Sequence, residues 1–174
     1  MHWSKTWRST LVVVAAGLVV ACGYRPAYKE EPENQSEIEL QPALPTYPIA
    51  SNLKRIDLGP DEPFEYSVDT GSVSLAAGPV LLYTLVVRSP AGAMNVSYEG
   101  MRCRSLERRI YASGRPDGTW AISRSATWLP ITRQQKGYFA LADSYFCPAR
   151  RPVLTAAEAV SALRAGGHPD AALR

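Results

Sequence analysis

Residues 81–89 have the sequence Leu-Leu-Tyr-Thr-Leu-Val-Val-Arg-Ser, and they indicate the fold class of this 174-residue chain. The segment is apolar on both faces and rich in β-branched and aromatic residues, which is typical of a strand inside a sheet. Pro90-Ala-Gly92 then favours a turn, because proline and glycine both suit turn positions. We therefore expect a central strand that ends near Ser89.

Before this segment, apolar and polar residues alternate with the two-residue period of half-buried strands. The alternation covers residues 64–69 and 73–75, and a further strand is expected over residues 95–103, with a kink at Gly100.

A hairpin is predicted between residues 108–114 and 120–131. Its turn, Arg115-Pro-Asp-Gly-Thr119, has proline and glycine where a tight turn needs them. In the second arm the alternation predicts one buried face, formed by Trp120, Ile122, Ala126 and Trp128. Arg124 falls on the same face, where a charge needs a partner or an aromatic lid. We expect it to stack beneath a tryptophan at the sheet edge or, alternatively, to line a ligand cleft.

A capping box, Thr155-Ala-Ala-Glu158, predicts a helix after the strands, and Gly166-Gly167 ends it. An apolar stripe along this helix is formed by Ala156, Ala159, Val160 and Leu163. The whole pattern predicts an α+β, β-dominated fold, with an antiparallel sheet of about five or six strands and one carboxy-terminal helix.

The amino terminus has the basic, apolar and small-residue order of a secretory signal. Lys5 and Arg8 precede an apolar run over residues 10–20, which is shorter than the roughly 20 residues that a helix needs to cross a bilayer. Residues 19–22, Val-Val-Ala-Cys, resemble a lipobox, the site at which bacterial lipoproteins are cleaved and acylated. The resemblance implies cleavage before Cys22 and lipid on that cysteine; a short transmembrane anchor is the alternative.

The lipobox also predicts the compartment and the domain boundaries. Gly23 follows the cysteine, in place of the aspartate that resembles an inner-membrane retention signal, so we expect anchoring at the periplasmic face of the outer membrane. Proline and acidic residues after it are typical of a chain that does not fold alone, although this stretch could instead dock on the domain. The expected parts are a signal peptide (1–21), an acidic Pro-rich tether (22–52), a folded domain (53–165) and a flexible tail (166–174).

Two cysteines remain once Cys22 is lipidated, and the periplasm favours their oxidation. A bond between Cys103 and Cys147 would close a loop of about 45 residues and contribute roughly 4 kcal/mol. The alternative is two buried free thiols. Two cysteines without histidine partners cannot complete a zinc shell, so we expect no metal and no other cofactor.

Several short segments of the predicted domain match a known family. They are Tyr83–Pro90, Asn95–Gly100, Arg102-Cys103, Tyr111-Ala112, Gly114-Arg115, Asp117–Trp120 and Tyr145–Pro148. Over roughly residues 64–165 the chain resembles the CNP-like (cryptic neisserial protein-like) family of uncharacterised proteobacterial envelope proteins, which are often lipoproteins. The resemblance supports the compartment and the disulfide pair, and it implies no catalytic residue.

The residues of common catalytic centres are missing from the predicted domain. It has no histidine before His168, which excludes Ser-His-Asp and Cys-His machinery. It also has no nucleophile elbow, phosphate loop, dinucleotide fingerprint or His-Glu-x-x-His helix. A carboxylate-based hydrolase is the remaining option, with candidates Asp69, Glu99, Glu107 and Asp143. We expect no enzyme.

Charge is distributed unevenly along the chain. Residues 23–69 have 4 basic and 10 acidic side chains, a net of −6, whereas residues 101–151 have 10 basic and 3 acidic, a net of +7. Lys5 and Arg8 lie in the segment expected to be removed, and without them 17 basic and 16 acidic residues leave a charge near +1. This is too small for a dedicated nucleic-acid binder. Arginine forks bind carboxylates and phosphates, so the candidate binding residues are Arg102, Arg104, Arg108, Arg109 and Arg124.

These observations predict a non-catalytic interaction or accessory module, attached to a membrane through Cys22, with an envelope protein or an anionic envelope component as partner. The alternative is a domain that binds an anionic ligand or the cell wall through an arginine and aromatic face. The first predicts a flat surface, and the second predicts a concave pocket lined by several of the arginines. The hydrolase predicts two carboxylates within about 5 to 9.5 Å of each other.

Overall fold

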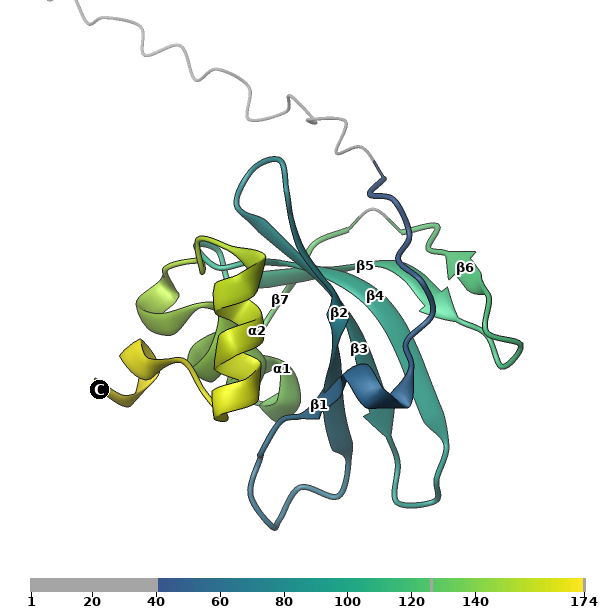
Figure 1. Ribbon diagram of the computed structural model, residues 1–174, viewed down its shortest axis with the longest axis horizontal. Helices are drawn as coiled ribbons and strands as arrows, with labels where there is room; N and C mark the ends of the chain where they lie inside the picture. Colours follow the sequence, from purple (N-terminus) through teal and green to yellow (C-terminus); the bar gives the residue numbers. More distant parts are fainter. Residues whose placement is uncertain (1–40, 126, 174) are drawn as a thin grey trace, which may run out of the picture. The chain divides into compact units, whose positions relative to one another are not determined.

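The computed structural model describes residues 41–125 and 127–173. In this part of the chain seven strands form one antiparallel sheet in the order β1-β2-β3-β4-β5-β6, and β7 also pairs with β5. The strands are β1 (Leu53–Arg55), β2 (Glu65–Ala76), β3 (Val80–Arg88), β4 (Met94–Arg102), β5 (Glu107–Gly114), β6 (Trp120–Ile122) and β7 (Leu129–Pro130). The helices are α1 (Lys136–Ala140) and α2 (Ala156–Ala165), with further helical turns η1 (Ala50–Asn52), η2 (Leu141–Phe146), η3 (Pro148–Arg150) and η4 (Pro169–Leu173). The expected β-dominated α+β fold, with an antiparallel sheet and a carboxy-terminal helix, is confirmed (Figure 1).

The apolar segment at residues 81–89 forms most of β3, which is paired on both sides with β2 and β4. Every residue from Val80 to Val86 is buried, as expected of a central strand. The predicted turn follows it: Gly92 has φ +84° and donates its backbone N–H to the Ser89 carbonyl at 2.9 Å.

The sheet has two differently covered faces. On one, which we call the helical face, Leu81, Tyr83 and Leu85 pack in a core with residues of η2 and α2. Figure 1 shows α1 and α2 on this side. On the other, which we call the aromatic face, Val80 and Leu82 pack with Tyr98, Tyr111, Ala112, Trp120 and Trp128.

The predicted hairpin between β5 and β6 forms, but its second arm is short. Arg115 N–H donates to the Thr119 carbonyl at 2.8 Å, and Gly118 has φ +79°. Strand β6 ends at Ile122, whose side chain is 61% exposed, so the expected buried face is wrong at this residue. The physical reason is that β6 pairs with only three residues of β5 before the chain leaves the sheet and returns as β7. Ala126 lies outside the described residues.

The end of the predicted tether lies on the domain. Trp120 Nε1 donates to the Pro45 carbonyl at 2.9 Å, and Tyr47 lies against the Trp120 ring. Of the predicted tether, residues 41–48 therefore contact the domain. The signal peptide, Cys22 and the acidic cluster lie outside the described residues.

Helix α2 begins and ends as the sequence predicts. Thr155 Oγ1 accepts the Glu158 N–H at 3.1 Å, and Gly166 ends the helix with φ +80°. The following residues differ from the expected flexible tail: His168 is buried and donates its backbone N–H to the Ser144 carbonyl at 2.7 Å. Among the described helices, none has the length and apolar character needed to cross a membrane.

Candidate functional site

The structure separates the five candidate arginines. Arg102 ends β4, Arg104 lies in the turn after it, and Arg124 lies between β6 and β7. Arg108 and Arg109 are neighbours on β5, so their side chains point to opposite faces of the sheet. Together with the strand pairing, this places Arg102 and Arg109 on the aromatic face and Arg108 on the helical face.

Arg102 and Arg109 each lie on an aromatic ring. The Arg102 guanidinium carbon is 4.0 Å from the centre of the Trp128 ring, and that of Arg109 is 4.8 Å from the centre of the Tyr111 ring. Gly100 lies below both rings, since a Cβ there would be 2.8 Å from Tyr111 and 3.3 Å from Trp128. We call these four residues, Arg102, Arg109, Tyr111 and Trp128, the arginine–aromatic patch.

Arg108 belongs to a buried polar cluster. Its guanidinium lies 3.8 Å from the Tyr138 ring centre, and its Nη1 is 3.6 Å from Glu99 Oε2. The Glu99 side chain has no exposed surface and also accepts hydrogen bonds from Ser97, from Tyr138 at 3.2 Å and from Tyr83 at 3.4 Å. A partner could not reach Arg108 without moving α1, so this arginine is a structural residue in this conformation.

Burial controls the protonation of this cluster. Desolvation raises the pKa of Glu99 above its usual value, although hydrogen bonds from Ser97 and the charge of Arg108 act in the opposite direction. Desolvation and the neighbouring carboxylate also raise the pKa of both Tyr83 and Tyr138, so these phenols remain protonated donors. Glu99 therefore has a raised pKa, as a general acid does, but its burial leaves a substrate no access to it.

Arg104 and Arg124 are exposed. The expectation that Arg124 shares a face with Trp120 and Trp128 is wrong, because β6 ends before it. The arginine that stacks on a tryptophan is Arg102, whose contact joins the end of β4 to the segment before β7. The alternation of apolar and polar residues within one segment cannot predict such a contact, because the two residues lie in different segments.

The four candidate carboxylates are distributed over different elements. Asp69 is buried on β2, where its Oδ1 accepts the Gly71 N–H at 3.0 Å in a bulge of the strand. Glu99 is buried on β4, Glu107 begins β5, and Asp143 lies in η2. Neither of the two buried carboxylates has the solvent access that a hydrolytic site requires.

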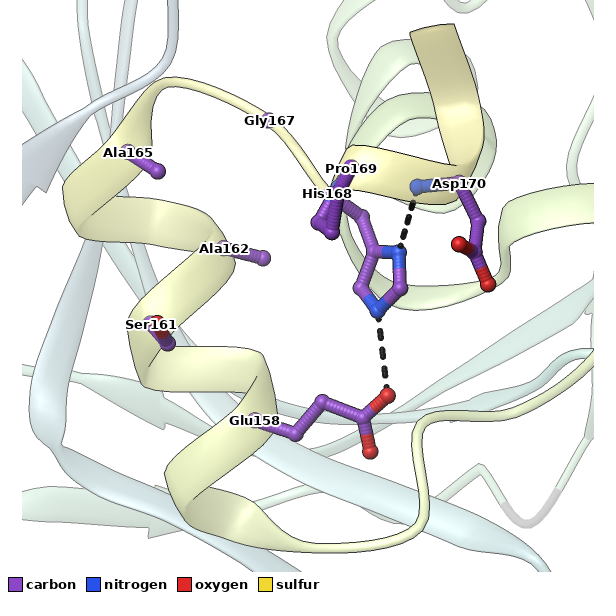
Figure 2. A pocket seen from close by; sticks show the side chains of 8 residues that line it. All are labelled: Glu158, Ser161, Ala162, Ala165, Gly167, His168, Pro169 and Asp170. Atoms are coloured by element: carbon purple, nitrogen blue, oxygen red, sulfur yellow. Dashed lines mark hydrogen bonds and ion pairs between the residues drawn. The ribbon is translucent and has the colours of Figure 1, made fainter. Parts of the chain in front are cut away.

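A pocket of about 420 Å³ lies beside α2 and η4. His168 and Glu158 point toward each other in it, with Nε2 and Oε1 3.0 Å apart, and the second ring nitrogen accepts the Asp170 N–H at 3.2 Å (Figure 2). The hydrogen bond from the Leu154 N–H, and to a smaller extent the one with His168, lower the pKa of Glu158. The sequence did not predict this pocket, because its lining combines residues of α2 with residues after Gly167 that were expected to be flexible.

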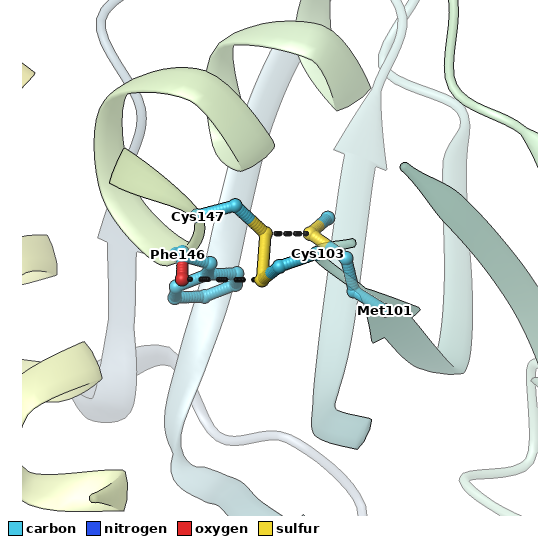
Figure 3. The surroundings of a disulfide bond; sticks show 4 residues. All are labelled: Met101, Cys103, Phe146 and Cys147. Carbon is cyan, nitrogen blue, oxygen red and sulfur yellow. Dashed lines mark hydrogen bonds between the residues drawn. A yellow bond between two sulfur atoms is a disulfide. The ribbon is translucent and has the colours of Figure 1, made fainter. Parts of the chain in front are cut away.

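The predicted disulfide is confirmed. Cys103 and Cys147 are joined, with their Cα atoms 5.2 Å apart. Figure 3 shows the bond between β4 and η2, where Cys147 Sγ lies 3.6 Å from Met101 Sδ and Cys103 Sγ lies 3.5 Å from the Phe146 carbonyl. Both cysteines are almost fully buried, so the bond fastens η2 to the helical face. Over residues 41–125 and 127–173, no group of three or more histidine, cysteine or acidic residues could hold a metal ion.

Fold and site together define a β-dominated, disulfide-linked domain with arginines stacked on aromatic rings. The chain matches the model of the CNP1-like family over residues 30–164, and it belongs to that family. The predicted resemblance is thereby confirmed, and the match includes the described part of the chain before the sheet. Comparison with curated proteins finds no match, and neither does comparison with solved structures.

Proposed function

We propose that this protein is a lipid-anchored envelope protein whose folded domain is a non-catalytic interaction module. Two features of different parts of the chain support the compartment. Residues 19–22 resemble a lipobox, and the Cys103–Cys147 disulfide is typical of an oxidising compartment such as the periplasm.

The arginine–aromatic patch is the observation on which the interaction module rests. Stacking on Trp128 and Tyr111 limits the rotamers of Arg102 and Arg109, so less side-chain entropy is lost when a partner binds. Arginine and tryptophan are also among the residues most enriched in the energetic centres of protein interfaces. Tyr111 is buried and supports Arg109 from below. Arg104 is exposed and lies two residues after Arg102, so it adds a second positive charge at the end of β4.

The polar groups of the domain support binding better than catalysis. Glu99 has the strongest environment for acid chemistry, but its carboxylate is fully buried and is engaged by Ser97, Tyr138 and Arg108. An anionic small ligand is the second candidate, and the pocket beside His168 does not suit it, because Glu158 and Asp170 place two carboxylates in its lining.

Membrane attachment is tested by changing Cys22 to Ala in the full chain. We expect the wild-type chain in the membrane fraction and the variant outside it. The double variant Cys103→Ser, Cys147→Ser is the control: it loses the disulfide but keeps Cys22, so it should remain in the membrane fraction. A Cys22→Ala variant that remains in the membrane fraction would overturn the lipid anchor.

The interaction surface is tested by placing a photoreactive residue at Arg104 in intact cells. The matched control is the same residue at Arg164, which is also an exposed arginine but lies on α2. We expect one envelope protein to be captured from position 104 and not from position 164. Capture of only lipid or cell-wall fragments would favour the anionic ligand, and equal capture from both positions would refute a specific surface.

A further inference from the structure

Residues 41–48 have the sequence Gln-Pro-Ala-Leu-Pro-Thr-Tyr-Pro, in which proline recurs at every third position. A polyproline II helix has three residues per turn, so these three prolines share one edge of such a helix. Proline fixes φ near the polyproline II value, and it also restricts the residue before it to extended conformations. Six of the eight residues are therefore biased toward this conformation before they contact the sheet.

The three prolines of this segment are half-buried, whereas Gln41, Ala43, Leu44 and Thr46 are exposed. Tyr47 departs from the three-residue period: it is also half-buried, because its ring lies against Trp120. The prolines and Tyr47 therefore face the domain. We call residues 41–48 the proline strap; in Figure 1 it is the dark-blue segment that leads into η1 beside β4, β5 and β6.

Side chains hold the strap on the aromatic face. The Trp120 indole N–H donates to the Pro45 carbonyl at 2.9 Å, and Gln41 Nε2 donates to the Tyr111 carbonyl at 3.2 Å. The Tyr47 hydroxyl donates to the Arg115 carbonyl at 3.1 Å. Each of these bonds involves a side chain, so the strap does not lie on the sheet as a further strand.

The ring that the strap contacts, Trp120, is joined to further aromatic rings of the buried aromatic face. Trp120 lies 5.3 Å from Tyr47 and 6.3 Å from Tyr98, and Tyr98 lies 6.1 Å from Tyr111, measured between ring centres. Gly114 makes room for the strap, because a Cβ there would lie 2.7 Å from the Tyr47 hydroxyl and 2.8 Å from Val96 Cβ. Several small domains also recognise polyproline II peptides through aromatic side chains. We call the surface that the strap contacts, around Trp120 and Gly114, the aromatic groove.

We propose that this aromatic groove is a recognition site for proline-rich extended segments, that the strap occupies it in cis, and that a proline-rich segment of another envelope protein displaces the strap. This inference rests on the proposed interaction module and names its partner class, but it does not involve the lipid anchor or Arg104. A segment on the same chain has an effective concentration of about a millimolar. The strap therefore competes with a foreign segment, which must bind more tightly than the strap to displace it.

The test uses the full chain in detergent, with nitrogen-15 in its tryptophan indoles. The signal of Trp120 is the one lost in Trp120→Phe. The strap is weakened by combining Pro45→Gly with Tyr47→Ala, or by Tyr47→Ala alone should the double variant fail to form the Cys103–Cys147 bond. The ligand is the free peptide with the sequence of residues 41–48, and the control peptide has the same composition with the three-residue proline period removed.

We expect the Trp120 indole signal to shift in the strap variant and to return toward its wild-type position as the free peptide is added. The peptide should bind the strap variant at least about tenfold more tightly than the wild-type chain, because the cis competitor is weakened. The control peptide should not restore the signal. Combining the weakened strap with Trp120→Phe, followed through the Trp128 indole signal, should reduce peptide binding.

Three outcomes would overturn the inference. An unchanged Trp120 signal in a folded strap variant would mean that the strap does not occupy the groove as proposed. A shifted signal that millimolar peptide does not restore would make the strap a fixed part of the fold. A wild-type dimer that exchanges straps between its copies would assign the groove to a second copy of this chain. In each case, specific capture from position 104 would leave the interaction module itself standing.

Discussion

Glu99 and Arg108 form a buried ion pair across β4 and β5 although they are not direct neighbours in the sheet. In the register of the two strands, Glu99 is opposite Ile110 and Arg108 is opposite Met101, so the pair is diagonal. Their oxygen and nitrogen atoms are 3.6 Å apart, and the side chains are 0% and 11% exposed, respectively. The raised pKa of Glu99 shows that desolvation outweighs the attraction of Arg108.

The first prediction concerns the two halves of this pair. Arg108→Met should lower the free energy of unfolding at neutral pH by about 3 kcal/mol, because it leaves a buried carboxylate without its cation. Glu99→Gln should cost less than Arg108→Met, since it neutralises the group that burial penalises and keeps a partner for Ser97 and Tyr138. Urea unfolding measures both values.

A matched control is the exposed pair of Arg55 and Glu65, whose charged atoms are 3.3 Å apart. Arg55→Met should change stability by less than about 1 kcal/mol, because water screens an exposed pair. If Glu99→Gln proved more costly than Arg108→Met, the attraction within the buried pair would exceed the cost of burying the carboxylate.

The second prediction is the pH dependence that follows from the raised pKa of Glu99. The folded state holds this proton more tightly than the unfolded state, in which the pKa of the carboxyl is near its usual 4.5. The contribution of Glu99 to stability is therefore fully present below that value and is lost as pH rises through the raised folded pKa. In Glu99→Gln this loss should be absent, and in Arg108→Met it should be larger.

The measurement is the difference in the free energy of unfolding between each variant and the wild type, at several pH values from 4 upward. Taking differences removes other carboxyls, such as Glu158, whose pKa is lowered and whose contribution has the opposite sign. A difference between Glu99→Gln and the wild type that does not change with pH would show that Glu99 titrates alike in both states.

Local patterns in the sequence predicted much of this fold. The apolar run of β3, the turn at Gly92, the turn at Gly118 and the cap at Thr155 each depend on residues a few positions apart. The disulfide followed from cysteine number and compartment. Local chemistry decides such features before the chain folds, which is why they were predictable.

Features that depend on distant segments were missed. Glu99 follows Asn95 and Ser97 at alternating positions, a polar pattern that predicts a solvated face. In the fold it is buried among groups from other segments, including Tyr138 of α1 and Arg108 of β5. Arg108 and Arg109 were grouped as one binding surface, although strand alternation already separates neighbouring residues. The length of β6 was misjudged because its pairing with β5, and not its own alternation, determines where it ends.

The third prediction concerns the disulfide between Cys103 and Cys147, which are 44 residues apart. Replacing both by Ser should lower the free energy of unfolding by roughly 4 kcal/mol, because the unfolded chain gains the entropy of the opened loop. Cys22→Ala should leave the stability of the domain unchanged. Urea unfolding with and without reductant compares the variants, and reductant should affect only chains that keep the pair. Equal stability of the double variant and the wild type would contradict the prediction.

The fourth prediction tests whether the segment after α2 is part of the folded domain. His168 is 8% exposed, its ring bridges Glu158 and the Asp170 backbone, and its own backbone N–H reaches Ser144. His168→Ala should therefore lower the free energy of unfolding by about 2 kcal/mol, because it removes packing and leaves polar groups with fewer partners.

The control for His168→Ala is Arg164→Ala on the exposed side of α2, which should change stability by less than about 0.5 kcal/mol. Hydrogen exchange gives a second readout, since the His168 amide is bonded to the Ser144 carbonyl at 2.7 Å and should exchange slowly in the wild type. A flexible tail would behave differently in both measurements: the amide would exchange at the rate of an unfolded peptide, and His168→Ala would be as mild as Arg164→Ala. Slow exchange together with the larger loss of stability would extend the folded domain to η4 and make Glu158 both a cap of α2 and its link to the carboxy terminus.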